Sequence, residues 1–364
     1  MIPGVDLLAC PLTGLTLREV TVDAAEASAG GPFVARSGGG TPRGRTPTVL
    51  LREDNGAAYP VDNGIPVLLG PERLQPAASG PFQVDLADAR YAEAYEEMAF
   101  YNEAAAQVEE TVHAASFPRL TAMATLGVAG RRQFPEPASL WLDATYESTA
   151  QLDAYRHLAP LDGTRILQLG GKGEQAVVFL LAGAEEAWVV SPMVGELAYA
   201  RALARRFGVD DRLRCAAGVA EELPLQTARF DRIWAKSMHH TIDALSYPQC
   251  ARVLRPGGRM AAVEPWRALL HTVGTKVLGK RERGVTCKPV TADRLGPFHQ
   301  AFSEAEVVRH GAFLRYPMIA IEKFGVTVSL STALRIGRID DRIGRVLPGV
   351  RNPGSCAALL AATA

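Results

Sequence analysis

From residue 161 onward, short apolar runs alternate with amphipathic stretches, and this alternation constrains the fold more than any other feature of the chain. The apolar runs predict strands at residues 165–169, 187–190, 213–217, 230–235 and 259–264. The amphipathic stretches predict helices near residues 175–181, 194–207 and 247–253. Strands that alternate with helices form a parallel sheet covered on both faces. Such sheets bind ligands beyond the carboxyl ends of their strands, where the strand order reverses.

The tail of the chain extends this pattern. The segments EVVRHGAF at 306–313 and SCAALLAATA at 355–364 predict two final strands, with a basic helical segment at 328–347 between them. Together with the strands above, they predict a Rossmann-like α/β sheet of seven strands within residues 159–364.

Two regions precede the predicted sheet. Residues 1–75 carry short apolar runs interrupted by a Gly-, Pro- and Ser-rich stretch at 29–47, which predicts a small β-rich domain. Residues 85–158 repeat apolar and aromatic positions at three- and four-residue spacing, which predicts helices. We expect these helices to form a lid over the ligand edge of the sheet.

The composition of the chain excludes several kinds of partner. Lys+Arg and Asp+Glu both number 39 in the 364 residues, so no net charge attracts nucleic acid or an anionic membrane. No apolar stretch reaches the roughly 20 residues of a membrane span, and the N-terminus resembles no export signal, so we expect a cytoplasmic protein. The cysteines lack C-x-x-C spacing, so we expect neither a metal site nor a disulfide framework. A small molecule is the expected ligand.

Four segments of the predicted sheet carry a family resemblance. They are LQLGGKGE at 167–174, GVAEELP at 218–224, FD at 230–231 with MHH at 238–240, and LRPGGR at 254–259 with VEP at 263–265. In this order they resemble the glycine loop, the G-D-A-E-x-L-P turn, the F-D…L-H-H segment and the L-R-P-G-G…E-P hairpin of class I S-adenosylmethionine-dependent methyltransferases, of the methyltransferase type 11 kind. The resemblance covers residues 161–264 clearly and implies that fold.

The resemblance also implies which positions would hold S-adenosylmethionine: Gln168, Gly170, Gly171, Gly173, Ser191, Val219, Ala220 and Glu221. Members of the family place one acid near the methionine amine, one on the ribose hydroxyls and an acid or amide at the adenine. Here the corresponding positions are Gln168, the segment at 190–192 and Val219, and none of them carries a carboxylate. In addition, Lys172 replaces a loop glycine, and a lysine in the pocket would repel the sulfonium cation.

Three functions remain open on this basis. The joint loss of the polar determinants favours a repurposed enzyme that performs elimination, cyclisation or proton transfer on a small molecule without a cofactor. The second is a genuine S-adenosylmethionine-dependent methyltransferase with a divergent cofactor site, and the third is a non-catalytic partner subunit. The Ala, Gly and Arg richness is typical of a GC-rich bacterial genome, and on this composition alone we expect a setting in natural-product biosynthesis.

The candidate catalytic residues are Lys172, His239, His240 and Glu264. Lys172 could anchor an anion or act as a base, and an imidazole after the fourth strand could transfer a proton at neutral pH. Each also has a structural alternative, namely a solvated lysine and a hydrogen-bonded histidine pair. The candidate substrate-binding residues are Trp266 and Arg267 after the fifth strand and Tyr91, Tyr95 and Tyr101 in the lid, although aromatic residues at helical spacing are more often core.

The N-terminal region carries a resemblance of its own. The segments LLACP at 7–11 and AYPVDNGIPVLL at 58–69 are similar to small zinc-ribbon proteins that activate tRNA methyltransferases. Zinc needs four well-spaced donors, but only Cys10 is present here and Thr13 stands where a second cysteine would fall. We therefore expect a degenerate ribbon that acts as a scaffold or an oligomerisation element, and a homodimer and a heteromeric partner both stay open.

Overall fold

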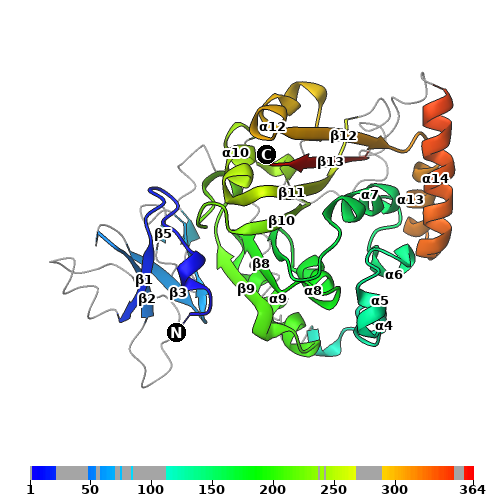
Figure 1. Ribbon diagram of the computed structural model, residues 1–364. Coiled ribbons are helices and arrows are strands. Elements are labelled where there is room, and N and C mark those ends of the chain that lie inside the picture. Colours follow the sequence, from blue (N-terminus) through cyan, green and yellow to red (C-terminus); the bar gives the residue numbers. More distant parts are fainter. Residues whose placement is uncertain are drawn as a thin grey trace.

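The structure is a computed structural model that describes residues 2–21, 48–54, 58–69, 74–75, 83–84, 112–236, 238–241, 243–267, 289–347 and 356–364. Its centre is a seven-stranded sheet (Figure 1). The strands are β7 Arg165–Leu169, β8 Glu186–Ser191, β9 Leu213–Ala217, β10 Phe230–Ala235, β11 Leu254–Pro265, β12 Glu304–His310 and β13 Cys356–Ala362. They lie in the order β12-β13-β11-β10-β7-β8-β9.

The connectivity of this sheet confirms the predicted Rossmann-like class. β7 to β11 pair in parallel, while β13 lies antiparallel between β11 and β12. The chain runs outward from β7 to β9 and then returns to place β10 on the other side of β7. The strand order therefore reverses between β7 and β10, which is where sheets of this class bind ligands.

Helices cover the two faces of the sheet. They are α4 Pro118–Ala124, α5 Val128–Arg131, α6 Ala138–Trp141, α7 Ser148–Leu158, α8 Glu174–Leu181, α9 Val194–Arg206, α10 Asp243–Val253, α12 Gly296–Ala301, α13 Arg315–Lys323 and α14 Leu330–Val346. Short 3-10 turns are η1 Val5–Leu7, η4 Asp210–Arg212, η5 Ala220–Glu222, η6 Met238–His240 and η7 Ala292–Leu295. The apolar faces of α7, α8 and α9 pack with one face of the sheet, and α10 and α12 pack with the other.

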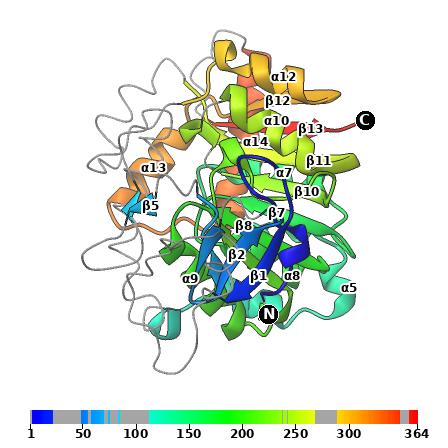
Figure 2. The same cartoon turned by 90° about the vertical axis from the view of Figure 1, so that its left-hand side faces the viewer.

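The N-terminal residues complete the second face of the sheet. Four antiparallel strands, β1 Leu17–Thr21, β2 Thr48–Arg52, β3 Ala58–Asp62 and β4 Ile65–Pro66, form a small sheet beside β8 and β9 (Figure 2). A further pair, β5 Leu74–Gln75 and β6 Gln83–Val84, is antiparallel. Since α8 and α9 both lie on the first face, Leu8, Leu50 and Tyr59 cover the second face around Trp188. This segment therefore contributes to the core of the molecule.

The contact between the two sheets includes the backbone. Leu8 forms a bridge with Leu225, and Val67 forms one with Ala217 at the end of β9. The predicted boundary at residue 75 and the zinc-ribbon resemblance stay predictions. Cys10 is buried with its Sγ 3.0 Å from the Tyr59 hydroxyl.

The predicted lid is described only from residue 112 onward. Tyr91, Tyr95 and Tyr101 lie outside the described residues. Within the described part, α7 differs from the expectation, because Tyr155 and Leu158 are fully buried against the sheet. Their apolar side chains make α7 a core helix rather than a cover over the ligand edge.

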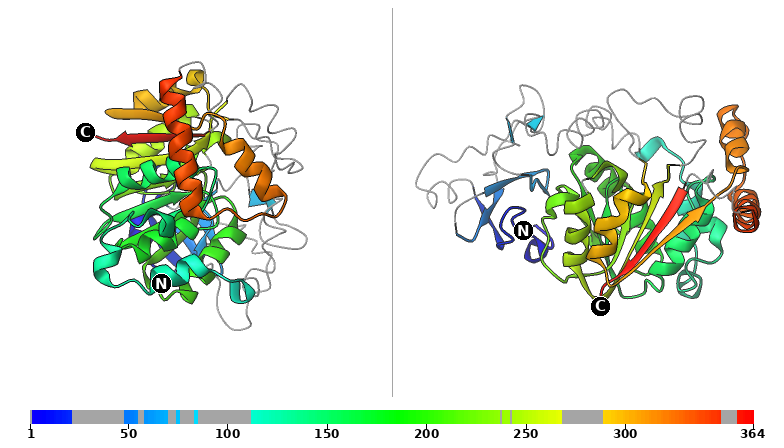
Figure 3. Two further views of the ribbon diagram at one scale, coloured as in Figure 1. Left: turned by 90° about the vertical axis from the view of Figure 1, so that its right-hand side faces the viewer. Right: turned by 90° about the horizontal axis from the view of Figure 1, so that it is seen from above.

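The last helices lie on the outer side of the molecule, away from the N-terminal sheet (Figure 3). Asp340 of α14 is fully buried, and its carboxylate accepts hydrogen bonds from the backbone N–H groups of Ala312, Phe313 and Leu314. The turn that leads into α13 is thereby attached to α14. Among the described residues, no helix is long and apolar enough to cross a membrane.

Candidate functional site

The glycine loop follows β7 at the point where the strand order reverses. Gly170, Gly171 and Gly173 all have positive φ, at 73°, 71° and 72°. A Cβ atom at Gly173 would lie 2.4 Å from the Cβ of Ala200 on α9. Glycine is therefore needed here by the backbone conformation and by the packing of the loop on α9.

Gln168 braces this loop from the end of β7. Its side chain is buried, its Nε2 donates to the carbonyl of Gly170 at 2.8 Å, and its Oε1 accepts from the N–H of Ala176 at 2.8 Å. Both amide atoms are thus used to join the loop to the first turn of α8. Gln168 thus binds the loop as a neutral side chain, at the position where the methyltransferases that the sequence resembles have an acid.

Lys172 does not lie buried in the loop. Its side chain is exposed, with Nζ 5.7 Å from the ring centroid of Tyr199 on α9. The Tyr199 hydroxyl in turn donates to Glu174 at 3.2 Å. A desolvated Lys172 base is therefore wrong, because the side chain stays in solvent over a tyrosine ring. The repulsion of a sulfonium by a pocket lysine loses its basis.

The carboxylate of Glu196 lies close to the end of β8. Ser191 is fully buried, and its hydroxyl lies 3.5 Å from Oε2 of Glu196 and accepts from the N–H of Met193. Glu196 belongs to the first turn of α9 and is itself buried. The carboxylate nearest to Ser191 in these contacts therefore comes from the following helix.

The turn after β9 is apolar where the family is polar. Val219 is buried and extended, directly before η5. Ala220 is half-buried, and Glu221 is buried within the turn. The structure thus places all the predicted cofactor-binding positions along the carboxyl ends of β7, β8 and β9.

His239 and Glu264 are brought together across β10 and β11. Nδ1 of His239 lies 2.5 Å from Oε2 of Glu264, a fully buried carboxylate that also accepts the backbone N–H groups of Met238 and His239. Because a carboxylate only accepts, Nδ1 carries the proton and Nε2 is the ring nitrogen that can take one up. The ring of His240 packs on that of His239 with centroids 4.0 Å apart.

Further polar groups surround this pair. Asp243 accepts two hydrogen bonds from Arg294, at 2.7 and 3.0 Å. The buried Tyr247 hydroxyl has no hydrogen-bond partner among the described residues. Burial, together with the charges of Glu264 and Asp243, raises the pKa of Tyr247 well above its ordinary value, so the phenol stays protonated.

The sequence did not reveal a second polar cluster at the same edge. Lys236 directly follows β10, and its Nζ lies 3.1 Å from Glu147 and 3.7 Å from Asp143. Asp143 also accepts hydrogen bonds from Gln151 and from Gln175 in the first turn of α8. Burial alone would lower the pKa of Lys236, but the carboxylates of Glu147 and Asp143 outweigh it and raise that pKa.

This second cluster has a consequence for the charge of the site. Two carboxylates face one ammonium here, so the cluster has one more formal negative charge than positive. The only signal in the sequence was a lysine directly after a predicted strand, since Asp143 and Glu147 lie in a distant segment.

Trp266 and Arg267 directly follow β11. Trp266 is buried in the core beside the guanidinium of Arg309 on β12, 5.5 Å from its ring centroid. Arg267 is exposed, and its backbone N–H donates to Val290. Their substrate-binding role stays a prediction. No group of three or more metal-ligating side chains occurs among the described residues.

The middle of the chain is similar to known methyltransferases. Residues 167–262 match the family model described as a methyltransferase domain. The 27-O-demethylrifamycin SV methyltransferase of Amycolatopsis mediterranei is 40% identical over 122 residues, which cover 32% of this chain and 44% of that protein. Methyltransferase GfsG of Streptomyces halstedii is 36% identical over 153 residues, covering 40% of this chain and 54% of that protein. The chain thus spans about half the length of these relatives.

Among solved structures, the [4+2]-cyclase SpnF is similar over 60% of this chain and 82% of that chain. The identity is 19% and the TM-score is 0.40. A TM-score of this size supports no argument about function.

Proposed function

Because residues 167–262 of this chain match the family model of a methyltransferase domain, we propose that the protein is a methyltransferase that uses S-adenosylmethionine to modify a small molecule. The observation that carries the proposal is the placement of carboxylates at the ligand edge. Glu196 lies at the end of β8, and Asp143 and Glu147 lie beside the glycine loop. The sequence alone favoured a cofactor-free enzyme because the family's polar positions are altered together and Glu196 falls on the helix after the strand rather than at its end.

The residues fit a cationic cofactor at two positions and depart from the family at the third. Asp143 and Glu147 would face the methionine amine, and Glu196 would face the ribose hydroxyls. Val219 offers no polar group to the adenine, so apolar contact would hold that ring. S-adenosylmethionine would supply an electrophilic methyl group at this edge.

The protein's own residues would contribute to the reaction by removing a proton from the substrate. His239 is held by Glu264 in the tautomer whose Nε2 can accept a proton from a substrate hydroxyl. Glu264 is a positioning residue, because it acts through the imidazole and through the backbone of η6. The name of the Amycolatopsis relative states methylation of an oxygen, which suggests a hydroxyl as the acceptor here.

A titration tests the cofactor part of the proposal. We expect wild-type protein to bind S-adenosylmethionine and S-adenosylhomocysteine at micromolar concentration, and Glu196→Gln to weaken both at least about tenfold. Glu185→Gln is the matched control. Glu185 is exposed and directly precedes β8, at the end of the strand away from the ligand edge, so this variant should leave binding unchanged. Absence of binding by the wild-type protein would overturn the proposal.

One observation favours the cofactor-free alternative that the sequence suggested. Gln168 uses both amide atoms inside the loop, and Val219 is apolar, so two family contacts are absent together. In that case the pair of His239 and Glu264 would move the proton in an elimination or a cyclisation. Turnover of a natural-product intermediate without S-adenosylmethionine, lost in His239→Ala, would support it, and transfer of labelled methyl from the cofactor to an acceptor would exclude it.

A further inference from the structure

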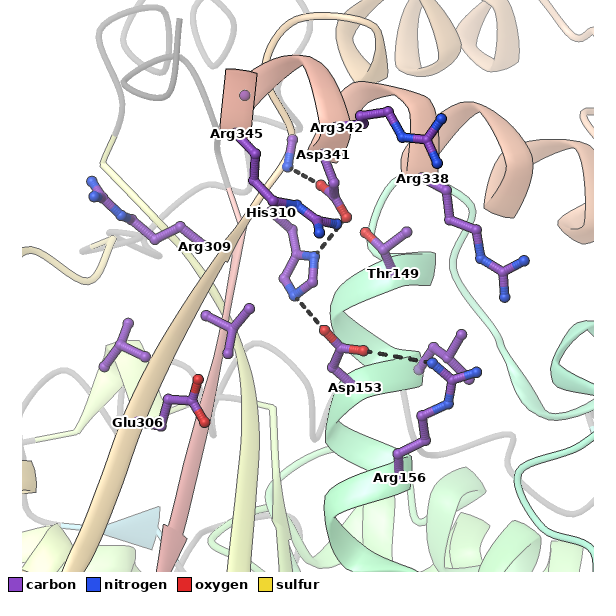
Figure 4. Close-up of a pocket in the computed structure, with 15 residues that line it drawn as sticks. Thr149, Asp153, Arg156, Glu306, Arg309, His310, Arg338, Asp341, Arg342 and Arg345 are labelled. Carbon is purple, nitrogen blue, oxygen red and sulfur yellow. Dashed lines mark hydrogen bonds and ion pairs between the residues drawn. The ribbon is translucent and has the colours of Figure 1, made fainter. Parts of the chain in front are cut away.

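A cavity of about 710 Å³ lies at the edge strand β12, outside the ligand edge discussed above. It is lined by α7, β12 and α14, and β13 and β11 separate β12 from β10. Its volume is in the range of small-molecule sites. Five arginines and three carboxylates belong to the residues that line it (Figure 4). The guanidinium of Arg309 lies over the ring of Trp266, and the other four arginines still outnumber the carboxylates.

Three of these arginines form one row on α14. Arg338, Arg342 and Arg345 are spaced at i, i+4 and i+7, so they share a helix face and span roughly 10 Å along the axis. All three are exposed, and none makes an ion pair within 4.0 Å of any residue that the structure describes. In Figure 4, Arg338 and Arg345 extend from α14 toward α7 and His310.

Two of the cavity's carboxylates are already engaged at its floor. Asp341 lies 2.9 Å from Nδ1 of His310 and accepts the N–H of Gly311 at 2.6 Å. Asp153 lies 3.4 Å from Nε2 of the same imidazole and 4.0 Å from Arg156. Their charge is directed at the histidine between α7 and α14, and no described carboxylate, Glu306 included, forms an ion pair with the guanidinium row of α14.

The row is also held in place by the fold. Asp340, the neighbour of Asp341, accepts three backbone N–H groups of the turn before α13. The adjacent carboxylates thus attach α14 to the end of β12, and the arginines stand on a fixed helix. A helix backbone that needs no rearrangement lowers the ordering cost of binding an anion, because only the arginine side chains must become ordered.

We propose that this cavity binds a small polyanion, a molecule that carries two or more phosphate or carboxylate groups. Guanidinium groups pair with both kinds of oxyanion through paired, charge-assisted hydrogen bonds. A row of roughly 10 Å matches several anionic groups in sequence better than a single one. The site is independent of the methyl-transfer proposal, because it uses none of the same residues.

The test uses full-length protein and calorimetric titration in buffer of low ionic strength with tripolyphosphate, citrate and orthophosphate as probes. We expect saturable binding of one tripolyphosphate or citrate per chain, and at least about tenfold weaker binding of orthophosphate. Binding of tripolyphosphate alone identifies a phosphate ligand, and binding of citrate alone identifies a carboxylate ligand.

The matched variants decide whether the row is responsible. Arg338→Gln combined with Arg342→Gln should weaken the probe at least about tenfold. Arg229→Gln, which removes an exposed arginine directly before β10 and outside the lining of the cavity, should leave the affinity unchanged. Failure of tripolyphosphate and citrate to bind, or equal loss in the control, would overturn the proposal.

Discussion

Nδ1 of His239 and Oε2 of Glu264 lie 2.5 Å apart, and the same carboxylate holds the backbone of the turn that carries the histidine. The orientation of the imidazole and the conformation of η6 therefore depend on one buried group. A structural role and a catalytic role for this pair are compatible, because the hydrogen bonds of Glu264 that hold the turn also orient the ring of His239.

Replacing His239 tests its chemistry. We expect His239→Ala to lower kcat by about 10²- to 10⁴-fold, the usual contribution of a positioned acid or base. Glu264→Gln should lower kcat less and move the acidic limb of the kcat/KM profile to lower pH, because the carboxylate that favours the protonated ring is gone. His299→Ala removes an exposed histidine of α12 as the control, and steady-state kinetics across pH is the measurement. An unchanged profile in Glu264→Gln would assign Glu264 to the backbone alone.

Gly173 offers a test of packing in the glycine loop. Gly173→Ala places a Cβ 2.4 Å from that of Ala200 at a φ of 72°, so we expect a loss of about 2–4 kcal/mol in the free energy of unfolding. Gly163→Ala is the control, since its φ is 68° but no atom lies within 4 Å, and it should lose only about 1 kcal/mol. Denaturant unfolding measures both, and Ala200→Gly should restore part of the loss. Equal losses in the two variants would contradict the clash.

Lys236 should stabilise the acids around it. Lys236→Met leaves Glu147 and Asp143 without their cation, so we expect a loss of about 1–3 kcal/mol in the free energy of unfolding. Lys172→Met, at the solvent-exposed lysine of the glycine loop, should change stability by less than about 0.5 kcal/mol. Thermal unfolding compares the two, and a greater loss in Lys172→Met would reverse our assignment of the two lysines.

His157 should make stability depend on pH. Burial lowers its pKa below the ordinary value of 6.5, with help from the charges of Arg259 and Arg232 and against the hydrogen bond to Ala361. The unfolded chain then binds the proton more readily than the folded one, so stability is complete above pH 6.5 and falls as the pH drops through the folded pKa. Unfolding at pH 7.5 and 5.0 should show a smaller difference in His157→Gln than in the wild type. His299→Gln is the control, and an identical pH dependence in the wild type and His157→Gln would be the contrary result.

The predicted sheet agrees closely with the observed one because its strands are short, apolar and separated by amphipathic helices. The predicted strand at 187–190 is observed as Glu186–Ser191, and the one at 259–264 lies inside a longer strand, Leu254–Pro265. The role of the N-terminal residues was not visible in the sequence. Tyr59 and Leu50 follow an ordinary strand pattern, and nothing local shows that they cover Trp188.

The site was predicted less completely than the fold. His239 follows the predicted strand at 230–235 and Glu264 ends the predicted strand at 259–264, so parallel pairing brings them to one edge. The acids that we propose for cofactor binding come from other elements, Glu196 from a helix and Asp143 from the segment before α7. Alignment of strand ends cannot identify such groups, because only the folded chain brings them to the edge.

The placement of β13 has a consequence for how the protein is made. This strand lies between β11 and β12, pairs with both, and occupies residues 356–362. During synthesis β12 emerges from the ribosome long before the strand that attaches it to the sheet. Until then its edge and that of β11 are open to other chains, the exposure that promotes aggregation. The sheet is thus complete only after β13 has been synthesised, although β11 and β12 precede it in the chain.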